Sequence, residues 1–128
     1  MIERLGGSPK LANGDIVPLS AAVRAGNLLF ISGQLGLDDQ GRLVAPDVAG
    51  QLRQIVKRLR AALALAGADL DAVVKTTVWL TEAQDFPAFN AAYREFFGAQ
   101  PPARSTVVSQ LLIPGARVEV EAIALLKP

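Results

Sequence analysis

The stretch Arg117-Val118-Glu119-Val120-Glu121-Ala122-Ile123-Ala124 alternates between two kinds of side chain at every second position. This period of two predicts a β-strand, because successive side chains of a strand point to opposite faces of its sheet. One face is small and apolar, and it holds Val118, Val120, Ala122 and Ala124. The other face begins charged and ends with Ile123 and Leu125, which indicates partial cover by something outside this short chain.

The stretch Pro101-Pro102-Ala103-Arg104-Ser105-Thr106-Val107-Val108 precedes it and predicts a second strand. Its two prolines make a rigid entry, and the β-branched residues that follow favour an extended chain. Arg104 falls at the beginning of this strand. If the two strands pair across the short connection at 112–116, Arg104 and Glu119 become neighbours.

Hydrophobic periodicity elsewhere predicts further strands and two amphipathic helices. The expected strands are 2–5, 20–23, 28–35 and 73–81. One helix is expected from an N-cap at Asp47 to about Ala66, and the other covers 86–97 after an N-cap at Asp85. Two such helices can cover only one face of a sheet. We therefore expect a single α+β domain over residues 1–128, with a mixed sheet of about five to six strands and both helices packed on one face.

The strand expected at 73–81 places Val74, Thr76, Val78 and Leu80 on one face. The uncovered face of the sheet mixes apolar and charged residues, namely Trp79, Ile123 and Leu125 beside Lys75, Glu119 and Glu121. A face of this kind is commonly covered by another copy of the same chain, so we expect a homo-oligomer.

The composition narrows the possible functions. Thirteen basic and twelve acidic side chains give a net charge of +1, which argues against a nucleic-acid or membrane-surface partner. No apolar run approaches the ~20 residues that span a bilayer, and the N-terminus lacks the apolar block of a signal peptide, so a cytoplasmic protein is expected. Neither cysteine nor histidine occurs, which removes thiol nucleophiles, histidine triads and the usual zinc sites.

Arg104 and Glu119 are the candidate catalytic residues. An arginine offers a planar fork of donors that fits a carboxylate, and a glutamate shielded by apolar neighbours can take a proton from water. Together they suit hydrolysis of a small electrophilic carbon next to a carboxylate. The alternative interpretation is a cross-strand ion pair, which contributes at most ~1 kcal/mol when exposed.

Two further residues carry open alternatives. Gly33 lies inside the strand expected at 28–35, where a glycine marks a bulge, a close approach to the backbone, or simply tight packing. Asn90, on the helix expected at 86–97, belongs either to a site or to the solvent-facing side of that helix.

Five motifs together resemble the RidA family, the YjgF-like reactive-intermediate deaminases. They are Ser32-Gly33-Gln34, Val74-Lys75-Thr76-Thr77-Val78, Phe89-Asn90-Ala91-Ala92-Tyr93 with Phe96-Phe97, Pro102-Ala103-Arg104-Ser105-Thr106, and Val118-Glu119-Val120-Glu121-Ala122-Ile123-Ala124. Their order and spacing cover the chain from about residue 20 to its end. The resemblance implies a chorismate-mutase-like α+β fold, a barrel-like homotrimer, and sites in the clefts between subunits.

The resemblance also implies roles for single residues. Arg104 would bind the carboxylate of a 2-imino acid, and Glu119 would position the attacking water. The backbone at Gly33 and Thr106 would contact water or substrate, and Ser32 and Asn90 would line the pocket. The implied reaction is hydrolysis of 2-iminopropanoate or 2-iminobutanoate to a 2-oxo acid and ammonia, without a cofactor, as a form of metabolite damage control.

The chain departs from the family pattern at two positions. Val17-Pro18-Leu19 stands where many deaminases have Gly-Pro-Tyr, so Leu19 implies a more apolar pocket. Thr106 stands where many members have cysteine. One alternative is a regulatory protein that binds a small carboxylate, such as a 2-oxo acid, without turnover. Another is an endoribonuclease or translation inhibitor, which the charge balance and the lack of histidine disfavour.

Overall fold

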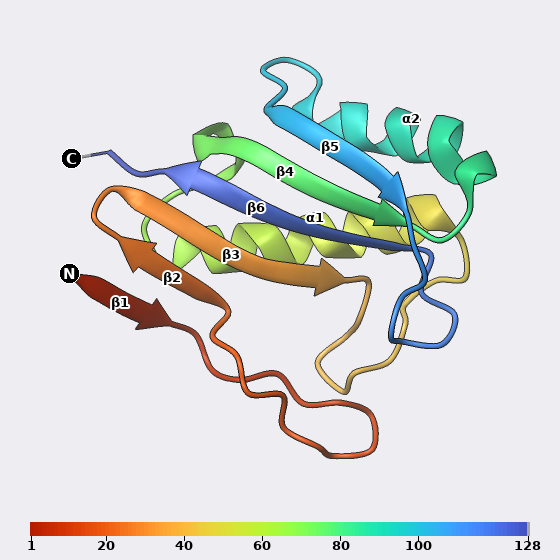
Figure 1. Cartoon of the computed structure of the whole chain (residues 1–128), viewed down its shortest axis with the longest axis horizontal. Helices are drawn as coiled ribbons and strands as arrows, with labels where there is room; N and C mark the ends of the chain where they lie inside the picture. Colours follow the sequence, from red (N-terminus) through yellow and green to blue (C-terminus); the bar gives the residue numbers. More distant parts are fainter. Residues whose placement is uncertain (128) are drawn as a thin grey trace.

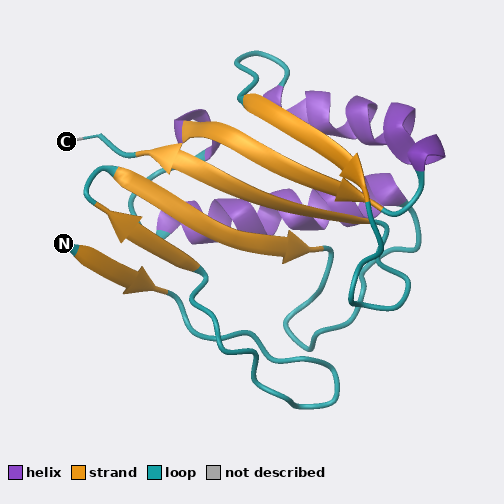
Figure 2. Cartoon of the chain, viewed as in Figure 1, coloured by secondary structure: helices purple, strands orange, loops and turns teal. Residues whose placement is uncertain are grey.

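The computed structural model describes residues 1–127, which form a six-stranded sheet with two helices behind it (Figure 1). The strands are β1 (Ile2–Leu5), β2 (Ala22–Ala25), β3 (Leu28–Leu35), β4 (Val73–Leu80), β5 (Ala103–Val108) and β6 (Val118–Leu125). The helices are α1 (Val48–Ala64) and α2 (Phe86–Phe97), both on the same face of the sheet (Figure 2). The expected α+β architecture is confirmed.

The strand order is β1-β2-β3-β6-β4-β5. Strand β6 lies between β3 and β4 and is antiparallel to both. Strand β5 is parallel to β4 at the edge of the sheet. A parallel pair needs a crossover connection, and α2 provides it between β4 and β5.

Strands β5 and β6 do not pair, so the condition for a contact between Arg104 and Glu119 within one sheet is not met. Residues 109–117 connect the two strands and carry the chain past β4, so that strand separates β5 from β6. The connection at 109–117 is longer than a tight hairpin turn, so it does not require β5 and β6 to be neighbours.

Strand β4 contains a bulge that the sequence pattern did not predict. Its pairing with β6 shifts between Val73 and Lys75. As a result Val73 is buried while Val74 is 45% exposed, although the sequence pattern had placed Val74 on the buried face. One extra residue in a strand reverses the faces on one side of it. Beyond the bulge, Thr76, Val78 and Leu80 are buried as expected.

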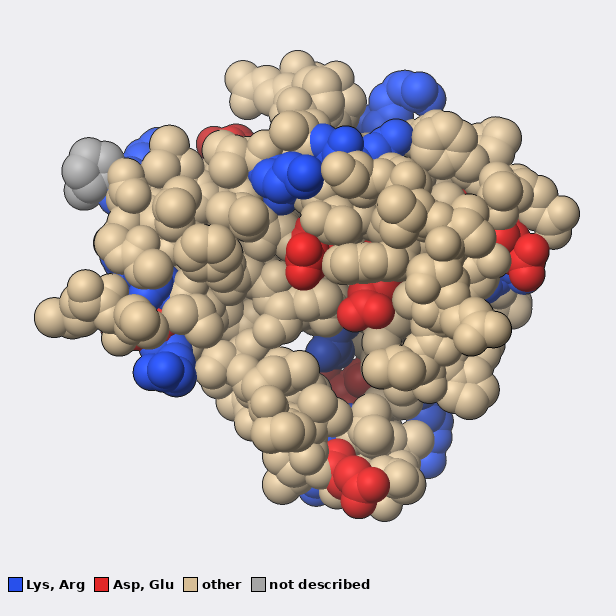
Figure 3. Space-filling view, viewed as in Figure 1, with Lys and Arg blue, Asp and Glu red and all other residues tan. Residues whose placement is uncertain are grey.

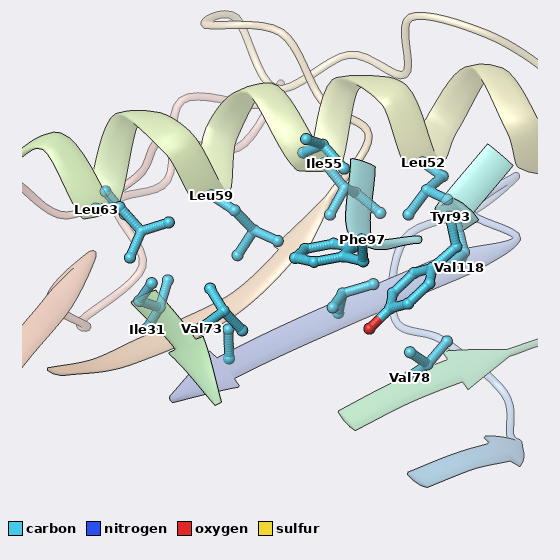
Figure 4. Close-up of a cluster of buried hydrophobic side chains, with 14 of the residues drawn as sticks. Ile31, Leu52, Ile55, Leu59, Leu63, Val73, Val78, Tyr93, Phe97 and Val118 are labelled. Carbon is cyan, nitrogen blue, oxygen red and sulfur yellow. The ribbon is translucent and has the colours of Figure 1, made fainter. Parts of the chain in front are cut away.

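The core lies between α1, α2 and the inner face of the sheet (Figure 4). Helix α1 contributes an apolar stripe, which includes Leu52, Ile55, Leu59 and Leu63. Its N-cap is Asp47, whose side chain accepts a hydrogen bond from the backbone N–H of Gly50, as predicted. Tyr93 and Phe97 of α2 fill the space between this stripe and the strands (Figure 4).

Asp85 does not cap α2 as the sequence predicted. Its side chain makes no capping hydrogen bond. Instead both of its carboxylate oxygens accept hydrogen bonds from Arg117, at 2.8 and 3.0 Å. This ion pair joins the start of α2 to the segment that enters β6. Within residues 1–127, neither helix has the length and apolar character needed to cross a membrane.

Candidate functional site

Glu119 lies on the outer face of the sheet, away from the helices. Its register partner in β4 is Trp79, and a cleft beside it is also lined by Gly33, Glu121 and residues 109–112. Partial burial raises the pKa of the Glu119 carboxyl group, and repulsion from the Glu121 carboxylate raises it further. The Glu119 carboxylate therefore holds a proton more readily than an exposed glutamate does, which is a property that a general base needs.

Gly33 is explained by its contact with this carboxylate. The pairing of β3 with β6 shifts between Ile31 and Gln34, so Gly33 lies in a bulge. A Cβ atom at Gly33 would clash with Oε2 of Glu119. The close-approach interpretation of this glycine is confirmed, because only a residue without a side chain leaves room for the carboxylate.

Ser32 connects this region to the N-terminal segment. Its hydroxyl donates a hydrogen bond of 2.6 Å to the carbonyl oxygen of Ser20, and its backbone N–H donates one of 3.0 Å to Ala21. Leu19 precedes this attachment and is partly exposed. These bonds fasten the N-terminal segment, with Leu19, beside the Gly33 bulge of β3.

Arg104 lies on the opposite face. Its register partner in β4 is Thr76, which in turn pairs with Ala122 of β6, and both partners are buried on the helix side. The guanidinium carbon lies 4.8 Å from the ring centre of Tyr93, 5.3 Å from that of Phe89 and 5.7 Å from that of Phe86. A separate hollow beside Arg104 is lined by Asn90, Tyr93, Arg94, Phe97, Gly98, Pro101 and Pro102.

Thr106 shares this face with Arg104, two residues further along β5. It pairs with the buried Val78 and is partly buried itself. Asn90 and Arg104 line the same hollow, which favours the interpretation that Asn90 belongs to a site.

Five of the seven candidate site residues fall into two groups: Glu119 and Gly33 line the outer cleft, and Arg104, Asn90 and Thr106 lie on the helix side. Ser32 and Leu19 line neither the outer cleft nor the hollow beside Arg104. Strand β4 separates β5 from β6, and the Arg104 and Glu119 side chains point to opposite faces. The two residues are therefore not neighbours within one chain. We call the Glu119 cleft and the Arg104 hollow the two half-sites of the chain.

Sequence reasoning missed the aromatic contacts of Arg104. Phe89 and Tyr93 are buried in the core, whereas Phe86 is 41% exposed. The available signal was the spacing of residues 86, 89 and 93, which places three rings on one side of a helix. Sequence reasoning also missed Leu111 and Leu112, which line the Glu119 cleft.

The side chains offer little for a metal ion. Glu119 and Glu121 are the acidic residues of the outer cleft. Across residues 1–127, no three acidic, histidine or cysteine side chains gather as ligands.

The fold and these residues define a class: small α+β proteins that hold an arginine against aromatic rings on one face of the sheet and a partly buried carboxyl group on the other. The chain belongs to the family described as Endoribonuclease L-PSP, whose model matches residues 11–126. Solved members of this fold are named as YjgF or Rid proteins. The resemblance to the RidA family is confirmed.

Named relatives cover most of the chain. It is 42% identical over 110 residues to the RutC family protein PH0854 of Pyrococcus horikoshii, covering 85% of this chain and 87% of that one. It is 40% identical over 118 residues to human 2-iminobutanoate/2-iminopropanoate deaminase, covering 91% and 86% respectively. These names support a RidA-type enzyme without fixing its substrate.

The fold matches solved structures along almost its whole length. Yeast Mmf1 superimposes with a TM-score of 0.87 at 26% identity, covering 99% of this chain and 100% of that one. RidA from the Antarctic bacterium Psychrobacter sp. PAMC 21119 gives a TM-score of 0.84 at 30% identity, covering 97% and 99%.

Proposed function

We propose that this protein is a cytoplasmic deaminase that hydrolyses 2-imino acids, such as 2-iminopropanoate and 2-iminobutanoate, to 2-oxo acids and ammonia. The observation that carries the proposal is the pair of half-sites: an arginine over aromatic rings on one face and a glutamate of raised pKa on the other. The names of relatives at about 40% identity support the same activity.

The complete site forms between two copies of the chain in this proposal. The outer face of the sheet exposes Phe30 (43%), Leu125 (48%) and Val107 (48%), which favours cover by another subunit. Figure 3 shows acidic side chains near the middle of this face and basic ones toward the β5 edge. The basic edge of one copy is complementary to the acidic centre of the next, which would bring Arg104 of one subunit to Glu119 of another. A closed homotrimer repeats this contact three times.

The two groups divide the reaction between them. The guanidinium of Arg104 binds the substrate carboxylate through paired hydrogen bonds and holds the imine carbon over the Glu119 cleft. Glu119 takes a proton from water, and the resulting hydroxide attacks the C=N carbon. Glu119 returns this proton to the imine nitrogen, which gives a neutral carbinolamine. It then takes the hydroxyl proton of the carbinolamine and passes it to the amino group, so the C=O bond forms as the C–N bond breaks and the nitrogen leaves as ammonia. No cofactor takes part.

Arg104→Ala tests this assignment. We expect activity to fall by at least about a hundredfold, because the carboxylate loses a bidentate, charge-assisted partner. Imines are generated with an amino-acid oxidase, trapped with semicarbazide, and the loss of trapped product is measured. Arg53→Ala is the matched control, since Arg53 is exposed and its ion pair is with Glu95, outside the Arg104 hollow. Full activity in Arg104→Ala, with the oligomer intact by size-exclusion chromatography, would refute the proposal.

Leu19 favours a second candidate, a protein that binds a small carboxylate without turnover. It lacks the hydroxyl that the family tyrosine supplies, while the Arg104 hollow is unaffected by the change. Calorimetric binding of a 2-oxo acid, combined with no activity across a panel of imines, would select this function. Ribonuclease activity, which the family description names, has less support because thirteen basic side chains are balanced by twelve acidic ones.

A further inference from the structure

The surroundings of Arg104 differ from those of the arginines that form ion pairs in this structure. Arg53, Arg60 and Arg117 each use guanidinium donors on a carboxylate, at 2.8 to 3.0 Å. The guanidinium of Arg104, in contrast, makes no hydrogen bond or ion pair within residues 1–127, although its backbone belongs to the β4–β5 ladder. Its contacts are instead the three aromatic rings of α2.

These rings form a wall with a defined geometry. Phe86, Phe89 and Tyr93 are three and four residues apart on α2, so their side chains share one side of the helix. A cation over a ring face is attracted by the electrons of the ring, and this attraction uses none of the N–H donors of the cation. The wall can therefore hold the guanidinium while leaving its donors available to a carboxylate.

The wall is itself anchored to the sheet. The Tyr93 hydroxyl and the Thr76 hydroxyl form a buried hydrogen bond of 2.8 Å. Thr76 is also the register partner of Arg104 in the neighbouring strand. Phe89 is fully buried and lies 5.3 Å from Tyr93 between ring centres. Phe86, at 41% exposure, is the outermost ring. Packing thus fixes the rings of Phe89 and Tyr93, and the ring of Phe86 lies at the solvent-exposed end of the wall.

We propose that Phe86, Phe89 and Tyr93 are positioning residues that hold the Arg104 guanidinium ready for a carboxylate. The consequence for ligand binding rests on the proposed function, whereas the ring contact itself does not. In this arrangement α2 serves as more than a core helix, because one side of it sets the position of the anion-binding group.

Phe86→Leu is the decisive variant, because Phe86 is the most exposed ring and its replacement leaves the core intact. Phe96→Leu, on the same helix but outside the ring wall, is the matched control. We expect Phe86→Leu to weaken 2-oxobutanoate binding by about two- to fivefold, the size of an exposed cation–π contact, and to raise KM similarly with kcat unchanged. Calorimetry and the imine-trapping assay measure the two effects. Equal effects of Phe86→Leu and Phe96→Leu would overturn the positioning role.

A double-mutant cycle on stability tests the contact without relying on activity. Urea unfolding of Phe86→Leu, Arg104→Gln and the double variant gives a coupling energy, which we expect to be favourable because removing either partner removes the same contact. The same cycle with Phe96→Leu should show no coupling. Zero coupling between positions 86 and 104 would refute the inference. An inactive wild-type protein with intact coupling would instead refute only the proposed reaction.

Discussion

Gly33 and Glu119 fit each other at the scale of single residues. A methyl group at Gly33 would occupy the position of the Glu119 carboxylate. Because that carboxylate is the end of a flexible side chain, it can move aside. We expect Gly33→Ala to cost little stability, about 1 kcal/mol or less, but to reduce activity at least about tenfold by displacing the base.

Gly7→Ala provides the control for this prediction, since nothing lies within 4 Å of a Cβ atom at Gly7. Urea unfolding and the imine-trapping assay are measured side by side for the two variants. An active Gly33→Ala enzyme would show that the carboxylate position seen beside Gly33 is not the position used in catalysis.

Burial, and after it the charge of Glu121, decide the pH range in which Glu119 could act as the base of the proposed reaction. Burial and the charge of Glu121 both raise the pKa of Glu119 above its ordinary value of 4.5. The reaction needs the ionised form, so kcat/KM should fall as the pH drops through this raised pKa. Glu121→Gln removes the like charge, lowers the pKa of Glu119, and should move the acid limb of the profile to lower pH.

The measurement for this prediction is kcat/KM against pH for the wild type, Glu121→Gln and the exposed control Glu3→Gln. The control should leave the acid limb in place. An acid limb in Glu121→Gln that stays put or moves to higher pH would contradict the assignment of Glu119 as the base.

At the scale of elements, the sequence predicts where strands and helices begin and end better than it predicts how they pair. The bounds expected for 28–35 and 86–97 match β3 and α2, because alternation, helical spacing and flanking turn residues are local signals. The position of β5 is not a local property. It depends on which strand edge remains open after β6 has paired with β3 and β4.

The candidate site shows the same division between local and distant information. Gly33 signalled a close approach, but the neighbour that approaches comes from β6 and is known only from the fold. The aromatic residues of α2 were recognisable as core, while their second contact, with Arg104, depends on the parallel register of β4 and β5. The register of β4 with β5 and with β6 also decides that Arg104 and Glu119 lie on opposite faces of the sheet, which neither strand's own sequence reveals.

At the scale of the whole molecule, one sheet separates the two groups that the proposed chemistry needs together. A flexible loop could not reunite them, since both lie on strands held by neighbours on the same sheet. The exposed apolar residues of the outer face and the opposite charges of its centre and its β5 edge instead favour contact with a second copy (Figure 3). Catalysis and assembly are then linked, because a monomer would hold both half-sites and no complete site.

Subunit mixing tests that link. Chains with Arg104→Ala and chains with Glu119→Gln should each be inactive alone. After the two are unfolded together and refolded at equal concentration, a site that takes one group from each of two copies regains both groups in about one quarter of random pairings. We therefore expect about a quarter of the wild-type activity, with none in a mixture of the two variants refolded separately. Mixed oligomers, verified by mass spectrometry, that remain as inactive as the separate variants would place both groups in one chain's site or remove one of them from the chemistry.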